Sequence, residues 1–148
     1  MIMDFEKFAS DGNRFLKELS TSLNSPWDRE HAAHALKATL NTLREQLTVE
    51  ESLQLIAQLP LALKAVYVDG WSIKAHDQPR HHGGFLNRVM EHLAMIAPVP
   101  THGHSIEVMV RAVFFNLRKH ISDGEWEDVL AQLPKDVKKL LTEPLQVH

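Results

Sequence analysis

The feature that most constrains this chain is an internal repeat. The tetrapeptide Ala57-Gln58-Leu59-Pro60 recurs as Ala131-Gln132-Leu133-Pro134, an offset of 131 − 57 = 74 residues. At the same offset, and with no gap, similar residues align from position 38 to position 64. Four of the identical pairs are Ala38 with Ala112, Leu43 with Leu117, Glu51 with Glu125, and Lys64 with Lys138. The repeat predicts that the chain folds as two copies of one structural unit.

Apolar residues in both copies recur at steps of three and four, which is the spacing of one helix face. No segment alternates with period two for long enough to form a strand. We therefore predict an all-α fold, a helical bundle of two similar four-helix units with about eight helices, related by a pseudo-twofold axis. We expect a single compact domain over residues 1–148, with units at residues 3–71 and 82–145 and a linker at 72–81.

Each copy contains a capping box followed by a proline corner. The boxes are Thr48–Glu51 and Ser122–Glu125. In such a box the hydroxyl accepts the amide of the glutamate, and the carboxylate returns to the amide of the capping residue. Pro60 and Pro134 follow one short helix later, and proline cannot continue a helix without losing a hydrogen bond. We predict that a new helix begins at each proline.

Other local signals concern the first part of the chain and the burial of single residues. Asp11-Gly12-Asn13 interrupts the apolar face of residues 3–23 and predicts a kink or a break there. Ser25-Pro26 resembles an N-cap followed by proline, so we expect a helix to begin at that point. Leu43 and Leu117 lie on inward faces and are predicted to be almost fully buried. The tryptophans are expected in the core: Trp27, Trp71 and Trp126.

Several of these motifs together resemble a known family. They are Phe-Leu-x-x-Val near the start of a unit, Ala-Val-x-x-x-Leu-Arg, the Ser/Thr-x-x-Glu box and the repeated Ala-Gln-Leu-Pro corner. With Tyr67-Val68-Asp69-Gly70-Trp71, they resemble the bacterial DUF2267 family, a domain of unknown function, in both repeats. The resemblance implies a helical bacterial protein. It carries over no activity, substrate or catalytic residue.

Composition excludes several classes of protein. The 148-residue chain has no cysteine, so disulfides, thiolate metal sites and cysteine nucleophiles are excluded. The net charge is −3 with neutral histidines, and no basic face suggests nucleic acid. No apolar run approaches the roughly 18 residues that cross a bilayer, and the start of the chain does not resemble a signal peptide. We expect a cytoplasmic protein that binds neither nucleic acid nor membrane.

Four polar residues of the repeat are candidate binding residues. Gln58 and Gln132 lie at the corners, where each amide either recognises a ligand or bonds backbone groups left open at the helix break. Arg44 and Arg118 lie in the last turn of their helices, where they either bind an anion or complement the helix dipole. If the arginines only complement helix ends, replacing either with alanine costs within about 1 kcal/mol.

The ten histidines are the compositional oddity. His31 and His34 share a helix face, and His81 and His82 lie in the linker, so a metal site built from these four is the alternative to solvated surface histidines. No His-Glu-x-x-His motif is present, and a structural zinc site normally needs four ligands. The sequence therefore favours surface histidines and no metal.

Two function classes remain. The missing catalytic motifs favour a non-enzymatic protein-interaction or structural module, with a protein partner or self-association and no cofactor. The alternative is a small-molecule or metal-binding protein, possibly an enzyme, that uses the histidine-rich segments.

Overall fold

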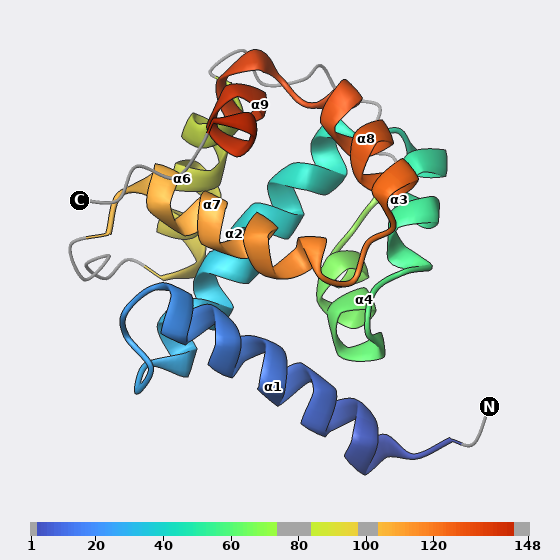
Figure 1. Ribbon diagram of the computed structural model, residues 1–148, viewed down its shortest axis with the longest axis vertical. Helices are drawn as coiled ribbons and strands as arrows, with labels where there is room; N and C mark the ends of the chain where they lie inside the picture. Colours follow the sequence, from blue (N-terminus) through green and yellow to red (C-terminus); the bar gives the residue numbers. More distant parts are fainter. Residues whose placement is uncertain (1–2, 74–83, 98–103, 144–148) are drawn as a thin grey trace.

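The computed structural model describes residues 3–73, 84–97 and 104–143. Within these ranges it contains helices and no strand, which confirms the predicted all-α class (Figure 1). The helices are α1 (Phe5–Ser22), α2 (Arg29–Gln46), α3 (Val49–Ile56), α4 (Leu61–Val68), α6 (Phe85–Ile96), α7 (Ile106–Arg118), α8 (Asp123–Gln132) and α9 (Lys135–Thr142). No described helix combines the length and the apolar character that crossing a bilayer requires.

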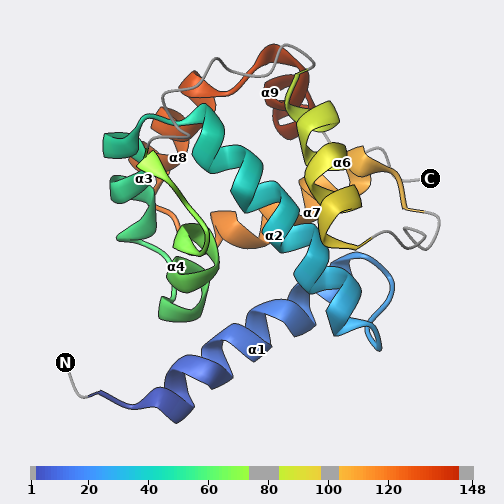
Figure 2. The ribbon, with the colours of Figure 1, turned by 180° about the vertical axis from the view of Figure 1, so that it is seen from behind.

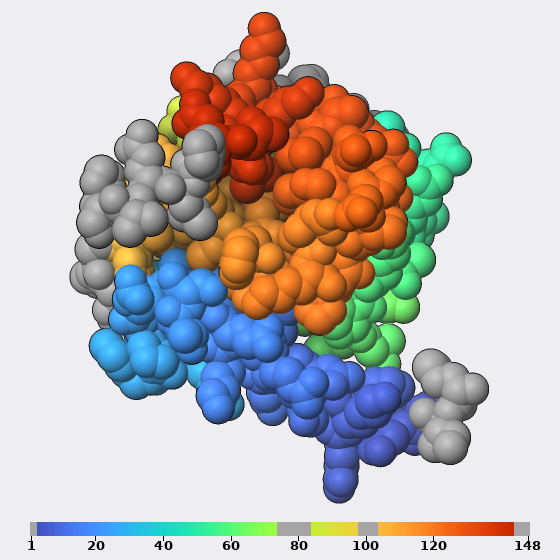
Figure 3. Space-filling model, in the orientation of Figure 1, coloured from blue at the N-terminus to red at the C-terminus, as the bar shows by residue number. Residues whose placement is uncertain are grey.

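Helix α2 runs through the centre of the molecule, and α7 crosses it (Figures 1 and 2). Helix α6 packs along α2, while α1 contacts α2, α4 and α7. Helices α3 and α8 lie side by side at one end of the bundle, and α9 packs on α6 and α7. The first turns of α1 extend beyond the rest of the molecule (Figure 3).

Three helix contacts among α1, α2 and α4 recur among α6, α7 and α9. The contacts α1–α2, α1–α4 and α2–α4 have counterparts in α6–α7, α6–α9 and α7–α9. Between the units, α2–α6 corresponds to α1–α7, while α2–α7 and α3–α8 each correspond to themselves. A pseudo-twofold axis between α2 and α7 would give this set of contacts. The superposition of the two units itself stays a prediction.

One apolar core spans both units. Leu43 and Leu117 are each 1% exposed, which confirms that both are buried. Phe15 of α1 and Phe85 of α6 occupy corresponding places near the start of each unit, and both are buried in the same core. Since each unit is small for an isolated core, burial shared between the units stabilises both.

Ion pairs join the units at corresponding places with the charges exchanged. On α2, Glu45 accepts from Arg88 of α6 at 2.8 and 2.9 Å, and Nε2 of His92 lies 2.8 Å from the same carboxylate. Glu45 aligns with Lys119 at the offset of 74, and Arg88 aligns with Glu18 at 70. Lys119 and Glu18 are also paired, with Nζ and Oε2 3.8 Å apart. Because the charges are exchanged, an alignment of the repeats by residue type does not show that the two ion pairs occupy equivalent positions.

Helix α1 is continuous from Phe5 to Ser22, so of the two predicted alternatives at Gly12 the break is wrong, while the kink stays a prediction. An added Cβ on Gly12 would lie 2.7 Å from Cβ of Ala62 in α4. The glycine therefore serves the close approach of α1 to α4 and not a break. Phe5, which the apolar pattern places on the inward face, is 70% exposed because the first turn lies beyond the packed region.

The predicted start of α2 at Ser25-Pro26 is also wrong. The helix begins at Arg29, where the Asp28 side chain accepts the amide of His31 at 2.9 Å. Ser25 instead accepts the amide of Asp28 at 2.9 Å in a turn that precedes the helix. Trp27 lies in this turn and is 80% exposed, so its predicted core position is wrong. Trp71 and Trp126 are partly buried against the core.

Candidate functional site

The candidate site lies where α3 and α8 pack side by side, and the capping boxes position it. The hydroxyl oxygen of Thr48 accepts the amide of Glu51 at 3.1 Å, and that of Ser122 accepts the amide of Glu125 at 3.2 Å. This part of each box is as predicted. Pro60 and Pro134 immediately precede α4 and α9, which confirms a new helix after each corner.

The returning bond of the second box has a different acceptor. The backbone amide of Ser122 donates to Oε1 of Gln58 at 2.7 Å, so a side chain from the first unit replaces Glu125 there. Gln58 therefore bonds the open backbone at a helix start, but in the other unit and not at its own corner. Among the described residues, Gln132 forms no equivalent hydrogen bond.

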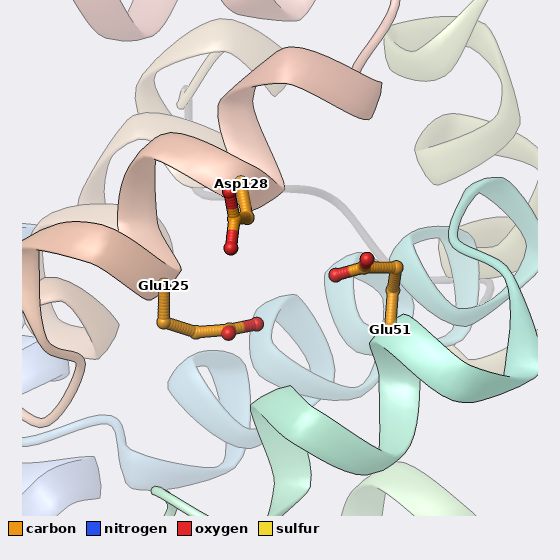
Figure 4. A group of neighbouring side chains, drawn as sticks. All are labelled: Glu51, Glu125 and Asp128. Atoms are coloured by element: carbon orange, nitrogen blue, oxygen red, sulfur yellow. The ribbon is translucent and has the colours of Figure 1, made fainter.

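In the described part of the chain the Thr48 amide forms no hydrogen bond with Glu51 either, so the predicted returning bond is wrong in both boxes. The two glutamates instead gather with Asp128 between the two helices. Glu51 on α3 faces Glu125 and Asp128 on α8, and all three side chains point into the space between the helices (Figure 4). One carboxylate oxygen from each lies within 4.8 Å of the others. Because Glu125 and Asp128 are three residues apart on a helix, they share one face.

Two of these carboxylate oxygens are buried without a partner. Oε2 of Glu51 and Oε1 of Glu125 have no hydrogen-bond partner among the described residues. Glu125 is only 8% exposed, whereas Asp128 is exposed. A buried polar group without a partner costs about 1–3 kcal/mol of stability, and more if charged. Negative charge in the space between α3 and α8 therefore lowers the stability of the folded protein.

The pKa of Glu125 reflects that cost. Burial raises the pKa of Glu125, and the negative charges of Glu51 and Asp128 raise it further. Burial disfavours the ionised form, and like charges at close range do the same. A bound positive charge would relieve both effects.

Arg44 does not lie in an open anion site. Its Nη1 donates to the carbonyl oxygens of Tyr67 and Asp69, at 2.9 and 2.7 Å, at the C-terminal end of α4. Burial lowers the pKa of Arg44, against the opposing effect of Glu45 and Asp69. Arg44 thus complements a helix end, as one of its two interpretations predicts, but the end belongs to α4 and not to its own helix.

Arg118 serves the end of its own helix. Its Nη1 donates to the carbonyl oxygen of Ile121 at 2.7 Å, and Nη2 contacts the carboxylate of Asp123. The guanidinium carbon also lies 5.7 Å from the ring centroid of Trp126. Neither arginine points into the carboxylate cluster, so the structure does not bring the four predicted binding residues together in one site.

The histidines of the predicted alternative metal site also have separate surroundings. His31 is buried, and its Nε2 lies 3.1 Å from Nδ1 of His104, whereas His34 lies 3.9 Å from Glu30. His81 and His82 lie outside the described residues. The predicted alternative metal set is therefore not assembled by the described residues, and His104 was not part of it.

Sequence reasoning missed two groups of charged residues. The first is Glu45 with Arg88 and His92, and the second is the carboxylate cluster between α3 and α8. Burial alone would raise the pKa of Glu45, but hydrogen bonds with His92 and Arg88 outweigh it and lower the pKa of Glu45 to about 2. The repeat does mark Glu51 and Glu125 as equivalent, but capping explained them both. Their equivalence, combined with an expected twofold axis, was the signal that the two carboxylates would meet.

Comparison with known proteins adds the family and no activity. A sequence profile described as "Uncharacterized conserved protein (DUF2267)" matches residues 12–140. No curated protein matches the chain.

Proposed function

The chain belongs to the DUF2267 family of uncharacterized conserved proteins, and we propose that it is a non-enzymatic binding module whose ligand carries positive charge. The proposed binding site is the carboxylate cluster of Glu51, Glu125 and Asp128. The ligand is either a metal ion or the ammonium group of a partner, which present the same charge to the carboxylates.

The observation that carries this proposal is the buried, unpartnered Oε1 of Glu125 opposite Glu51. Three of the four other candidate residues hold helix ends, because Arg44, Gln58 and Arg118 each bond backbone groups. Since buried charges in proteins are normally paired or bind a metal, two facing carboxylates without partners favour a cationic ligand. The absence of catalytic motifs in the sequence supports a non-enzymatic role.

Thermal unfolding of untagged protein tests the proposal. A ligand present at 100 times its dissociation constant stabilises the folded state by about 2.7 kcal/mol. We expect at least one of Ca²⁺, Mg²⁺, Mn²⁺ and spermidine to raise the melting temperature, and Glu125→Gln to abolish that rise. Glu127→Gln is the matched control, since it removes the same charge from an exposed position on α8. If none of the four cations stabilises the protein, the cationic ligand is wrong.

A further inference from the structure

The carboxylate cluster offers oxygen ligands alone, and the number of carboxylates distinguishes between divalent cations. One carboxylate oxygen from each of the three residues lies within 4.8 Å of the other two. Mg²⁺ demands a nearly ideal octahedron and is usually bound through one or two carboxylates. Three carboxylates from two helices therefore suit Ca²⁺, which is larger and more flexible in its coordination, better than Mg²⁺.

We propose that Glu51, Glu125 and Asp128 bind a divalent cation of the size of Ca²⁺, which links α3 of the first unit to α8 of the second. This inference rests on the proposed function and names its ligand. Ca²⁺ takes six to eight oxygen ligands in a flexible geometry, and carboxylates bind it through one or both oxygens. Three carboxylates can thus supply up to six oxygens, and the exposed Asp128 leaves the outer side of the site open to water.

Terbium luminescence gives a direct assay of the site. Tb³⁺ prefers oxygen ligands and is close to Ca²⁺ in size, and the indole of Trp126 lies next to Glu125 in the sequence. We expect excitation of tryptophan to produce terbium emission in the wild-type chain, and Ca²⁺ to displace Tb³⁺ at lower concentration than Mg²⁺ does. Glu125→Gln is expected to raise the apparent dissociation constant at least about tenfold.

Matched variants separate a ligand from a structural residue. Glu51→Gln is expected to weaken binding as much as Glu125→Gln does, although Glu51 is on a different helix. Glu50→Gln and Glu127→Gln remove one charge each from exposed neighbours and are expected to change the dissociation constant less than about twofold. Circular dichroism confirms that each variant is folded.

Each contrary outcome has a distinct meaning. If Mg²⁺ displaces Tb³⁺ as readily as Ca²⁺, or if only spermidine binds, the Ca²⁺-sized site is wrong and the proposed cationic ligand stands. If all four variants weaken Tb³⁺ equally, the ion responds only to surface charge, and the site is wrong. If neither Tb³⁺ nor any cation of the thermal assay binds, the inference and the proposed function both fail.

Discussion

Replacing Arg44 with alanine should destabilise the protein because Arg44 joins two helices that are distant in sequence. The side chain leaves α2 and donates to the carbonyl oxygens of Tyr67 and Asp69 at 2.9 and 2.7 Å. Hydrogen bonds with a charged partner contribute about 1.5–3 kcal/mol each. We assign about 1.5 kcal/mol of stability to the bond to Tyr67, which is partly buried, and about 0.5 kcal/mol to the bond to Asp69, because water screens an exposed bond.

The expected loss for Arg44→Ala is therefore about 2 kcal/mol, or roughly 4–8 °C in melting temperature for a domain of this size. This value replaces the limit of about 1 kcal/mol predicted from the sequence, because the bonds of Arg44 join two helices. Urea unfolding followed by circular dichroism measures it. Arg44→Lys retains the charge but has one nitrogen in place of the guanidinium fork, so about half of the loss is expected.

Arg118→Ala is the matched control, because Arg118 occupies the equivalent position in the second unit. Its bond to Ile121 spans only three residues, and Asp123, its ionic partner, is almost fully exposed. The expected loss is within about 1 kcal/mol. Equal losses for Arg44→Ala and Arg118→Ala would refute the argument that a tie between distant helices makes the difference.

Five further variants test the fold. Leu43→Ala and Leu117→Ala should each cost about 2–5 kcal/mol in a single cooperative transition, since both leucines are 1% exposed in one shared core; two separate transitions would show that the units unfold independently. Glu45→Gln should lower the unfolding free energy at neutral pH, and the difference should vanish as the pH falls from about 4.5 towards 2, because the folded pKa is lowered to about 2; a difference that persists in acid would mean that shape, and not charge, sets the effect. Gln58→Ala should cost about 1 kcal/mol by removing the acceptor of the amide at the start of α8, whereas Gln132→Ala should have a smaller effect on the same urea curves.

The sequence predicted the helical class, the proline corners and the buried leucines because these depend on local chemistry and on periodicity. Pro60 cannot continue α3, and Ser122 accepts an amide wherever a helix begins beside it. Errors arose where a neighbouring element decides. Gly12 suits a break in isolation, but in the fold it permits α4 to approach α1. Trp27 suits a core by its size, but it lies in a turn outside the packed helices.

The candidate site could be predicted only in part for the same reason. Glu51 and Glu125 were identified as capping residues, and a capping box normally uses the carboxylate for the amide of its own cap. Gln58 takes that amide in the second box, from a helix corner in the other unit. Neither that substitution nor the contribution of Asp128 follows from the spacing of residues along the chain. Both depend on how α3 and α8 pack.

The most direct test of the carboxylate site is the effect of Glu125→Gln on the unfolding free energy at neutral pH, without and with Ca²⁺. The pKa of Glu125 is raised above its ordinary value of 4.5, so the folded protein binds more protons than the unfolded chain between that value and the raised pKa. Stability therefore falls as the pH rises through this window, so at neutral pH the raised pKa of Glu125 costs stability. In a chelator, Glu125→Gln is expected to be more stable than the wild type. In saturating Ca²⁺ the order is expected to reverse, because only the wild type gains from the ion. The same order of stability in both solutions would contradict the account.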